Sequence, residues 1–294
     1  MTARIVVVGD LVTDVVAVLA GPPAPDTDTA ASIRFTGGGQ AANTAAWLAW
    51  HRVPVTLLAS VGADAAGAAR VAELRAAGVD CPLPPRADAP TGTVIVLAEG
   101  GRRTMVTDRG ASVLLDPDAV AAAVVGADHL HLSGYPLLDD GSRKAGLAAL
   151  AAAREHGLTV SVDAASAGPL RQVGAAAFLS WVRGVDLLLA NLDEAAVLTG
   201  SAAGDPTTQA RTLATDLGAA VVVKRGAGGA VWADAAGVVT VPAPPATVVD
   251  PTGAGDAFAA GLLATRLSGG DPRASLTAAA AAGARAVARI GARP

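Results

Sequence analysis

The residues best suited to chemistry lie in one short segment, Asp250-Pro251-Thr252-Gly253-Ala254-Gly255-Asp256. It follows a strand-like run and opens an apolar stretch with the composition of a helix. Gly253 and Gly255 leave the backbone bare, so that successive N–H groups can converge at the positive end of the helix dipole. Such a turn binds anions, and an aspartate inside it would repel them. An aspartate is therefore unfavourable there if the turn only binds anions, and its presence indicates a further function. We therefore predict that Asp256 takes a proton from a hydroxyl group, which then attacks a phosphorus atom held nearby.

The competing interpretation of Asp256 is structural, because aspartate is a favoured residue at the N-cap of a helix. A lone Gly-x-Gly-Asp pattern would favour the cap. The two aspartates spaced around Thr-Gly-Ala-Gly favour the catalytic interpretation instead.

The elements that must position this segment alternate along most of the chain. The predicted strands are residues 5–8, 55–60, 129–132, 159–162, 186–190 and 220–223, followed by a hairpin of 229–233 and 238–241. The predicted helices are residues 41–50, 65–77, 142–156, 192–199, 207–217, 255–267 and 272–289. Strands that alternate with helices predict βαβ units and a mostly parallel sheet, hence an α/β fold. Residues of about 11–36 and 91–110 break the alternation and are predicted to form a small β lid.

Composition and charge exclude several classes of protein. The net charge of −4 argues against a nucleic-acid partner, which needs a clustered basic face. No uninterrupted apolar run reaches the roughly 20 residues of a membrane span, so no membrane partner is expected. The first residues lack the pattern of a secretory signal, and the single cysteine, Cys81, cannot form an intrachain disulfide. We therefore expect a cytoplasmic protein.

Two glycine motifs carry a resemblance to a known family. The Asp250–Asp256 segment resembles the C-terminal motif of the ribokinase-like (PfkB) carbohydrate kinases, and Gly37-Gly38-Gly39-Gln40-Ala41-Ala42-Asn43 resembles their N-terminal motif. The resemblance covers essentially the whole chain. It implies one ribokinase-like domain over residues 1–294: a three-layer fold whose central, mostly parallel sheet is flanked by helices, with the β lid added. It also implies an ATP-dependent kinase that phosphorylates a hydroxyl of a sugar or sugar-like molecule.

The resemblance assigns roles at the phosphate end of the site. Asp256 becomes the general base, and the amides of Gly253, Ala254 and Gly255 neutralise charge on the transferred group. ATP and Mg²⁺ are implied as cofactors, bound by Asn191, Glu194, Lys224, Gly226 and Gly229.

Two of these assignments have structural alternatives. Asn191 and Glu194 stand three residues apart on one helix face, where they could orient Mg²⁺ through water. The pair also fits a capping box, and both roles can hold at once. Lys224 could reach a phosphate, or it could be a solvated surface lysine.

At the acceptor end, the resemblance implies that the sugar contacts Asp14, Gly38, Gly39 and Asn43. Asp250 matches a position that helps to hold a monovalent cation, so K⁺ is a further expected cofactor. Two departures from the family pattern weigh on this assignment. Position 251 is proline instead of threonine, and the sequence ends at Pro294, earlier than in members whose C-terminal loop completes the cation site.

Several alternatives stay open on the sequence alone. A nucleoside kinase of the same family is the main one, since a fold does not decide the acceptor. The chain has 4 Trp, 3 Phe and 1 Tyr, and Phe35 is the clearest aromatic residue in the lid segments, which favours a sugar. A non-catalytic sensor would have no need of Asp256, and a nicotinamide enzyme would need a Gly-x-Gly-x-x-Gly after the first strand.

Other features are predicted to be structural. His129 and His131 are interpreted as hydrogen-bonded histidines of the core or of a polar edge, and Trp47 and Trp50 as packing residues. No role is assigned to Arg109. The resemblance also implies a homodimer that pairs through the lid, since a small open sheet has edges and an apolar face to cover.

Overall fold

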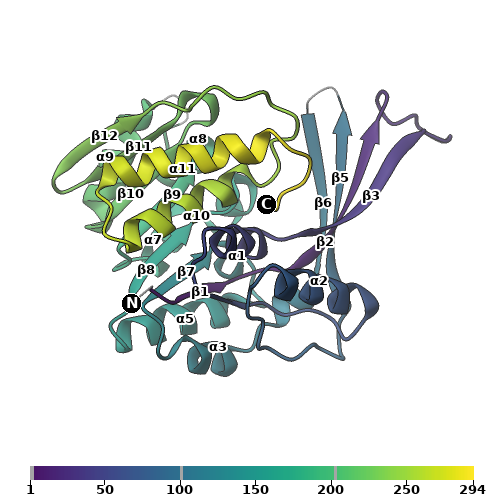
Figure 1. Cartoon of the computed structure of the whole chain (residues 1–294), viewed down its shortest axis with the longest axis horizontal. Helices are drawn as coiled ribbons and strands as arrows, with labels where there is room; N and C mark the ends of the chain where they lie inside the picture. Colours follow the sequence, from purple (N-terminus) through teal and green to yellow (C-terminus); the bar gives the residue numbers. More distant parts are fainter. Residues whose placement is uncertain (1–2, 100–101, 202–203) are drawn as a thin grey trace.

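The central sheet is built from short β-branched and leucine-rich runs that are mostly buried, as is usual for parallel strands covered on both faces. The computed structural model describes residues 3–99, 102–201 and 204–294, and within them the strand order is β12-β11-β10-β9-β8-β7-β1-β4 (Figure 1). Its strands are β1 (Ile5–Val8), β4 (Val55–Leu58), β7 (His129–Ser133), β8 (Thr159–Asp163), β9 (Leu187–Asn191), β10 (Ala220–Lys224), β11 (Ala230–Asp234) and β12 (Gly237–Val241). Neighbours from β4 to β10 pair in parallel, whereas β11 and β12 add an antiparallel edge. The predicted mostly parallel α/β sheet is confirmed.

Helices cover both faces of this sheet because alternate residues of a strand point to opposite sides. In β1, Ile5 and Val7 belong to a core shared with α1, α10 and α11, while Val6 and Val8 belong to a second core shared with α3, α5 and α8. The helices are α1 (Gln40–Trp50), α2 (Ala65–Ala76), α3 (Pro117–Val124), α4 (Tyr135–Leu138), α5 (Arg143–Glu155), α6 (Ala167–Val173), α7 (Ala175–Trp181), α8 (Leu192–Thr199), α9 (Pro206–Leu217), α10 (Ala254–Leu267) and α11 (Pro272–Val287), with 3-10 turns at Ala111–Leu114 and Gly226–Gly228. None of the helices in the described ranges is both long and apolar enough to cross a membrane.

A second, smaller sheet stands beside the main body (Figure 1). Its order is β3-β2-β5-β6, from β2 (Val12–Leu19), β3 (Ala31–Gly38), β5 (Thr91–Glu99) and β6 (Arg102–Gly110). It coincides with the predicted lid, except that β3 continues two residues past the predicted end, to Gly38. Residues 100–101 lie outside the described residues.

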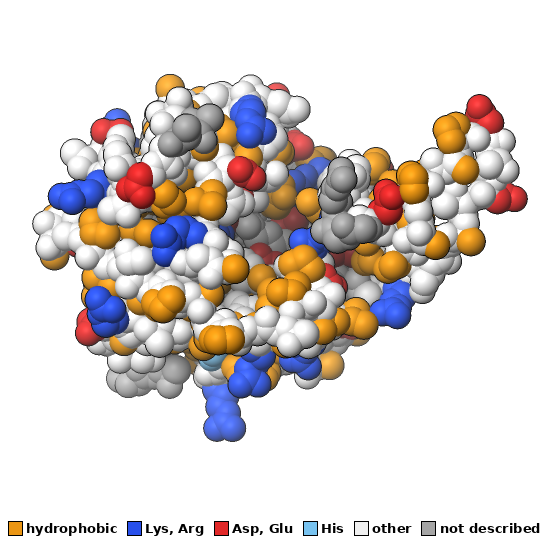
Figure 2. All heavy atoms as spheres, turned by 90° about the horizontal axis from the view of Figure 1, so that it is seen from above, with side chains coloured by type: hydrophobic (Ala, Val, Ile, Leu, Met, Phe, Trp, Pro, Cys, Tyr) orange, Lys and Arg blue, Asp and Glu red, His pale blue; other side chains and the backbone are white. Residues whose placement is uncertain are grey.

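The two faces of the small sheet differ in character. Asp14 pairs with Thr36, so Asp14 lies on the opposite face from Phe35, which pairs with Val15. The Phe35 face is apolar and open: Phe35 is 71% exposed, and Ile33, Ile95 and Val106 on the same face are exposed as well. Figure 2 shows hydrophobic side chains along this projecting part of the molecule.

Candidate active site

The glycine turn lies at the start of α10, as the sequence predicts. Gly253 is the N-cap of α10 and lies in the left-handed region, with φ of 74°. A Cβ at this position would lie 2.4 Å from the carbonyl oxygen of Ala292, so only glycine fits. Asp256 sits within the first turn of the helix and does not cap it. The helix-cap interpretation of Asp256 is therefore wrong.

The Asp256 carboxylate has a specific partner in α1. The side-chain amide of Asn43 donates a hydrogen bond from Nδ2 to Asp256 Oδ2 at 2.9 Å. The pKa of Asp256 is raised to about 7: burial is the largest cause, the carboxylates of Asp163 and Asp10 add to the rise, and the Asn43 hydrogen bond and Lys224 oppose it. A carboxylate with a pKa near neutrality suits a general base at physiological pH.

This pKa predicts the pH dependence of the reaction. Asp256 can accept a proton only when ionised, so kcat/KM is expected to fall about tenfold per pH unit below a pH of about 7. Removal of the Asn43 hydrogen bond, as in Asn43→Ala, takes away an interaction that lowers the pKa, so the acid limb should move to higher pH. The measurement is a kcat/KM profile between about pH 5 and pH 9 for both proteins; an acid limb near pH 4 in the wild type would contradict it.

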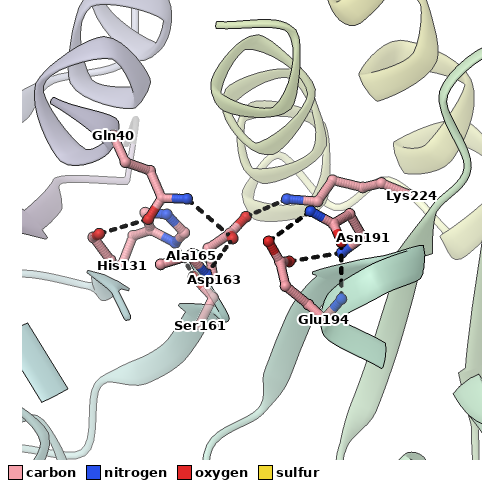
Figure 3. A network of polar contacts seen from close by, with 9 residues as sticks. Gln40, His131, Ser161, Asp163, Ala165, Asn191, Glu194 and Lys224 are labelled. Atoms are coloured by element: carbon pink, nitrogen blue, oxygen red, sulfur yellow. Dashed lines mark hydrogen bonds and ion pairs between the residues drawn. The ribbon is translucent and has the colours of Figure 1, made fainter. Parts of the chain in front are cut away.

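A buried ion pair lies beside the turn, at the carboxyl ends of β8 and β10 (Figure 3). Lys224 Nζ is 2.5 Å from Asp163 Oδ2, and the other oxygen of Asp163 accepts hydrogen bonds from Gln40 Nε2 and the amide of Ala165, both at 3.1 Å. Burial alone would lower the pKa of Lys224, but Asp163 and Glu194 outweigh it and raise that pKa above its usual value. Lys224 is therefore a charged, largely buried group paired with Asp163, and the interpretation as a solvated surface lysine is wrong.

The Asn191–Glu194 pair forms the capping box that was one of its two interpretations (Figure 3). Glu194 accepts hydrogen bonds from Asn191 N at 2.7 Å and Asn191 Nδ2 at 2.6 Å, and its own amide donates to Asn191 Oδ1 at 2.9 Å. Glu194 is 2% exposed, and burial raises its pKa while Lys224 opposes the rise. The capping role is confirmed, and the position beside Lys224 leaves the Mg²⁺ role open.

One cavity of about 740 Å³ joins these groups to the glycine turn. Its lining includes all the residues predicted to bind the nucleotide, together with the predicted base, Asp163 and part of the glycine turn: Asn191, Glu194, Lys224, Gly226, Gly229, Asp256, Asp163, Ala254 and Gly255. Its remaining walls are largely apolar, with contributions from Pro244, Pro245, Val248, Phe258 and Val287. The volume lies within the usual range for small-molecule sites, and an apolar slot that ends at a lysine and bare amides suits a nucleotide.

Position 229 requires glycine because of a close backbone contact, whereas the resemblance assigns this glycine to ATP binding. A Cβ there would lie 2.0 Å from the carbonyl oxygen of Val241, whereas the space around Gly226 is open. Gly229 thus allows the close approach of β12, and Gly226 is the glycine of this loop that faces open space.

The acceptor residues gather on the other side of Asp256, where the small sheet meets α1. A Cβ at Gly38 would lie 2.0 Å from Asp14 Oδ1, so the glycine makes room for this carboxylate, and Gly39 begins α1 as its N-cap. Asp14 is buried, and burial raises its pKa to about 6, with Asp10 adding to the rise and Arg293 opposing it. Asn43, predicted to contact the sugar, donates a hydrogen bond to Asp256, and its contact with a sugar stays a prediction.

Asp250 holds the turn together. Its Oδ1 accepts hydrogen bonds from the amide and the hydroxyl of Thr252, at 2.9 and 2.5 Å, and its Oδ2 accepts one from the amide of Gly291 at 3.1 Å. The guanidinium of Arg103, from β6, lies 3.9 Å away. Hydrogen-bond donors thus meet both oxygens of this carboxylate. The K⁺ dependence stays a prediction that a K⁺ titration would check.

The residues predicted to be structural have clear partners. His129 is hydrogen-bonded to Thr159 and Ser161 at 2.8 and 2.7 Å, and His131 to Ser161 at 2.8 Å. Burial lowers the pKa of His129 to about 3 and that of His131 to about 4, so both rings are neutral. The prediction of hydrogen-bonded core histidines is confirmed. Arg109 lies 3.5 Å from Asp10 and stacks over a tyrosine ring.

Sequence reasoning missed three groups at the site. Gln40 lies inside the quoted N-terminal motif, and its link to Asp163 is visible only in the structure. Arg103 donates to the hydroxyl of Thr252 from the lid, and Arg293 donates to Asn43 Oδ1. Neither arginine belongs to a local motif, so no spacing pattern could have pointed to it.

A mostly parallel α/β sheet, a small second sheet, and a nucleotide-sized cavity ending at a carboxylate inside an amide-rich turn define a small-molecule phosphotransferase. Known proteins agree with this class. Residues 2–294 match the sequence model of the pfkB family of carbohydrate kinases. The chain therefore belongs to the pfkB family, and it is an ATP-dependent carbohydrate kinase, a phosphotransferase with an alcohol group as acceptor.

Individual relatives span nearly the whole chain. The sequence is 34% identical over 277 residues to the ATP-dependent ribose-1-phosphate kinase of Halopiger xanaduensis, covering 92% of this chain and 87% of that protein. It is 32% identical over 248 residues to the 2-dehydro-3-deoxygluconokinase of Thermoproteus tenax, covering 79% of this chain and 73% of that protein. Among solved structures, the adenosine kinase of Sinorhizobium meliloti superposes with a TM-score of 0.89 at 25% identity, over 100% of this chain and 96% of that one.

Proposed function

We propose that this kinase transfers the γ-phosphoryl group of Mg²⁺-ATP to a hydroxyl of a sugar or sugar-like molecule, with Asp256 as the general base. The observation that carries the proposal is the position of Asp256. It closes the end of the nucleotide-sized cavity, lies in the amide-rich turn, and meets the acceptor residues through Asn43.

In the proposed reaction, Asp256 accepts the proton of the acceptor hydroxyl as its oxygen bonds to the γ-phosphorus. The bond from that phosphorus to the β,γ-bridging oxygen breaks, and ADP leaves. The N–H groups at the start of α10, from Gly253 to Gly255, and the charge of Lys224 stabilise the negative charge on the transferred group, and the N–H of Ala254 also makes a long turn hydrogen bond of 3.4 Å to the carbonyl oxygen of Pro251. Mg²⁺, when bound, would neutralise phosphate charge, with Asn191 and Glu194 as the residues that hold it through water.

The lid has a direct contact that supports its closure over the site. Arg103 of β6 donates a hydrogen bond to the Thr252 hydroxyl in the glycine turn. This contact joins the small sheet to the phosphate end of the site, 149 residues further along the chain. A closed lid would exclude water, which otherwise competes with the acceptor for the phosphoryl group.

A sugar acceptor is favoured over a nucleoside by the position of Phe35. This residue was the clearest lid aromatic that could stack on a base, and it lies on the opposite sheet face from Asp14. The two named relatives also act, by their names, on sugar derivatives that carry a phosphate or a carboxylate. A nucleoside is the second candidate, because the superposition on an adenosine kinase is close.

The test is ADP release with Mg²⁺-ATP over a panel of acceptors: ribose, ribose 1-phosphate, fructose, 2-dehydro-3-deoxygluconate, adenosine and other nucleosides. We expect release that depends on one sugar derivative and that is lost in Asp256→Asn. Release with nucleosides alone would select the second candidate. No release with any acceptor, from a protein that binds ATP, would contradict the proposed function.

We also propose that the apolar face of the small sheet pairs with the same face of a second copy. Phe35, Ile95 and Val106 form one cross-strand row on this face, and all three are exposed. Light scattering should give twice the chain mass, and Phe35→Asp should give the mass of one chain; a monomeric wild type would contradict the proposal. The cytoplasmic location stays a prediction.

A further inference from the structure

We infer that Arg293 is a positioning residue for the proposed reaction: it fixes the side-chain amide of Asn43 in the orientation that donates a hydrogen bond to Asp256. The inference rests on the proposed role of Asp256 as the base. Nothing in the sequence motifs points to Arg293, and its role follows from two hydrogen bonds that meet on one amide group.

The two bonds use opposite ends of the Asn43 amide. Arg293 Nε donates to Asn43 Oδ1 at 3.1 Å, and Asn43 Nδ2 donates to Asp256 Oδ2 at 2.9 Å. A guanidinium has only donors, so it can meet the amide oxygen and never the amide nitrogen. If the amide turned over, its nitrogen would face the arginine and its oxygen would face the carboxylate. Both new contacts would be repulsive, so Arg293 selects the orientation that serves Asp256.

Arg293 is itself held in place from several sides. Its Nη2 donates a hydrogen bond to the carbonyl oxygen of Gly38 at 3.0 Å, and its Nη1 lies 3.4 Å from Glu73 Oε2 on α2. The preceding residues are bound too, because the indole of Trp47 donates to the carbonyl oxygen of Ala292 at 2.9 Å. The side chain of Arg293 is 16% exposed. A group anchored in this way can impose an orientation on its neighbour.

The glycines of β3 show from which side Arg293 approaches. A Cβ at Gly37 would lie 2.2 Å from Arg293 Nη1, and a Cβ at Gly38 would lie 2.0 Å from Asp14 Oδ1. Successive residues of a strand point to opposite faces, so Arg293 and Asp14 lie on opposite sides of the end of β3. An acceptor bound at Asp14 is thus separated from Arg293 by the strand, and Arg293 acts on the base through Asn43.

Charged residues from several elements surround Arg293, Asn43 and Asp256. The charges that act on Arg293 are those of Glu73 and Arg70 on α2, Asp14 on β2, across the strand, and Asp256 on α10. Asp256 in turn faces Asp163 at the end of β8, Lys224 at the end of β10, and Asp10 after β1. Of the neighbours of Asp256, Asn43 supplies the direct hydrogen bond to the carboxylate. Loss of its orientation should therefore appear as a change in the titration of Asp256.

The experiment is a double-mutant cycle with Arg293→Ala, Asn43→Ala and the double variant, with Arg273→Ala, an exposed arginine of α11, as the matched control. We expect Arg293→Ala to lower kcat about tenfold, to change the KM for ATP less than twofold, and to move the acid limb of the pH profile upward. The double variant should be no worse than Asn43→Ala alone, because the two residues act as one unit. Arg293→Lys, whose ammonium can still donate to Asn43 Oδ1, should recover part of the activity.

A second readout does not need activity. The ¹⁵N signal of the Asn43 side-chain amide should titrate with Asp256 in the wild type, and this titration should be lost in Arg293→Ala. Asn43→Ala lacks the signal and so identifies it. Additive effects in the cycle, an unmoved acid limb, or an amide titration that survives in Arg293→Ala would each overturn the inference. A wild type without kinase activity whose amide signal still depends on Arg293 would instead contradict the proposed function alone.

Discussion

Asp256→Asn is expected to lower kcat at least about 100-fold, the scale of a lost general base. The substitution keeps the shape of the side chain, and its oxygen can still accept the hydrogen bond from Asn43. It removes the negative charge of the carboxylate and, with it, the capacity to take a proton from the acceptor hydroxyl. Because the cavity is otherwise lined as before, the dissociation constant of ATP should change little.

Two measurements test this expectation: the turnover of ADP release, and the affinity for ATP by calorimetry. The matched control is Asp216→Asn, an exposed aspartate of α9, which should behave as the wild type. A near-normal turnover of Asp256→Asn would refute the role of Asp256. A large loss of ATP affinity would show instead that the carboxylate shapes the nucleotide site.

Local patterns made much of the fold predictable. The helix predicted at residues 192–199 has the bounds of α8, because a capping box at Asn191 begins it and Gly200, in the left-handed conformation, ends it. Strands such as β1 could be predicted because a run of four β-branched residues is typical of a buried parallel strand. In each case the signal and the structure that it determines lie within a few residues of one another.

Elements without such a signal were missed. The helices α6 and α7 meet at Gly174, whose φ of 86° breaks the chain between them, and Gly168 and Pro169 lie in the first turn of α6. Glycine and proline usually indicate a loop, so residues 167–181 carried no helical prediction. Burial of Leu170 and Phe178 against the main core stabilises both helices, and that burial depends on distant residues.

The candidate site divides in the same way. The residues that we propose to face the nucleotide come in short motifs, so they could be named from the sequence, and they line one cavity. The contacts that join the motifs span long separations: 213 residues from Asn43 to Asp256 and 250 from Asn43 to Arg293. A single arginine far from any motif has no periodicity or spacing that could indicate its partner, so Arg103 and Arg293 emerged only from the folded chain.

Gly38→Ala is expected to raise the KM for the acceptor about 10- to 100-fold with little change in the KM for ATP. The backbone of Gly38 is not in the left-handed region, so alanine is allowed there and space alone decides the effect. The new Cβ would lie 2.0 Å from Asp14 Oδ1, and this buried carboxylate would have to move away from the acceptor. Loss of hydrogen bonds to a charged group, each worth about 1.5–3 kcal/mol, accounts for the expected factor.

The companion variants separate this cause from a general disturbance. Asp14→Ala should raise the acceptor KM by a similar factor, and adding Gly38→Ala to it should have almost no further effect, because the clash has lost its partner. An unchanged acceptor KM in Gly38→Ala would mean that Asp14 can move at no cost, and hence that it does not bind the acceptor. A further loss in the double variant would mean that Gly38 acts on the acceptor through its own backbone, whose carbonyl oxygen is already bound by Arg293.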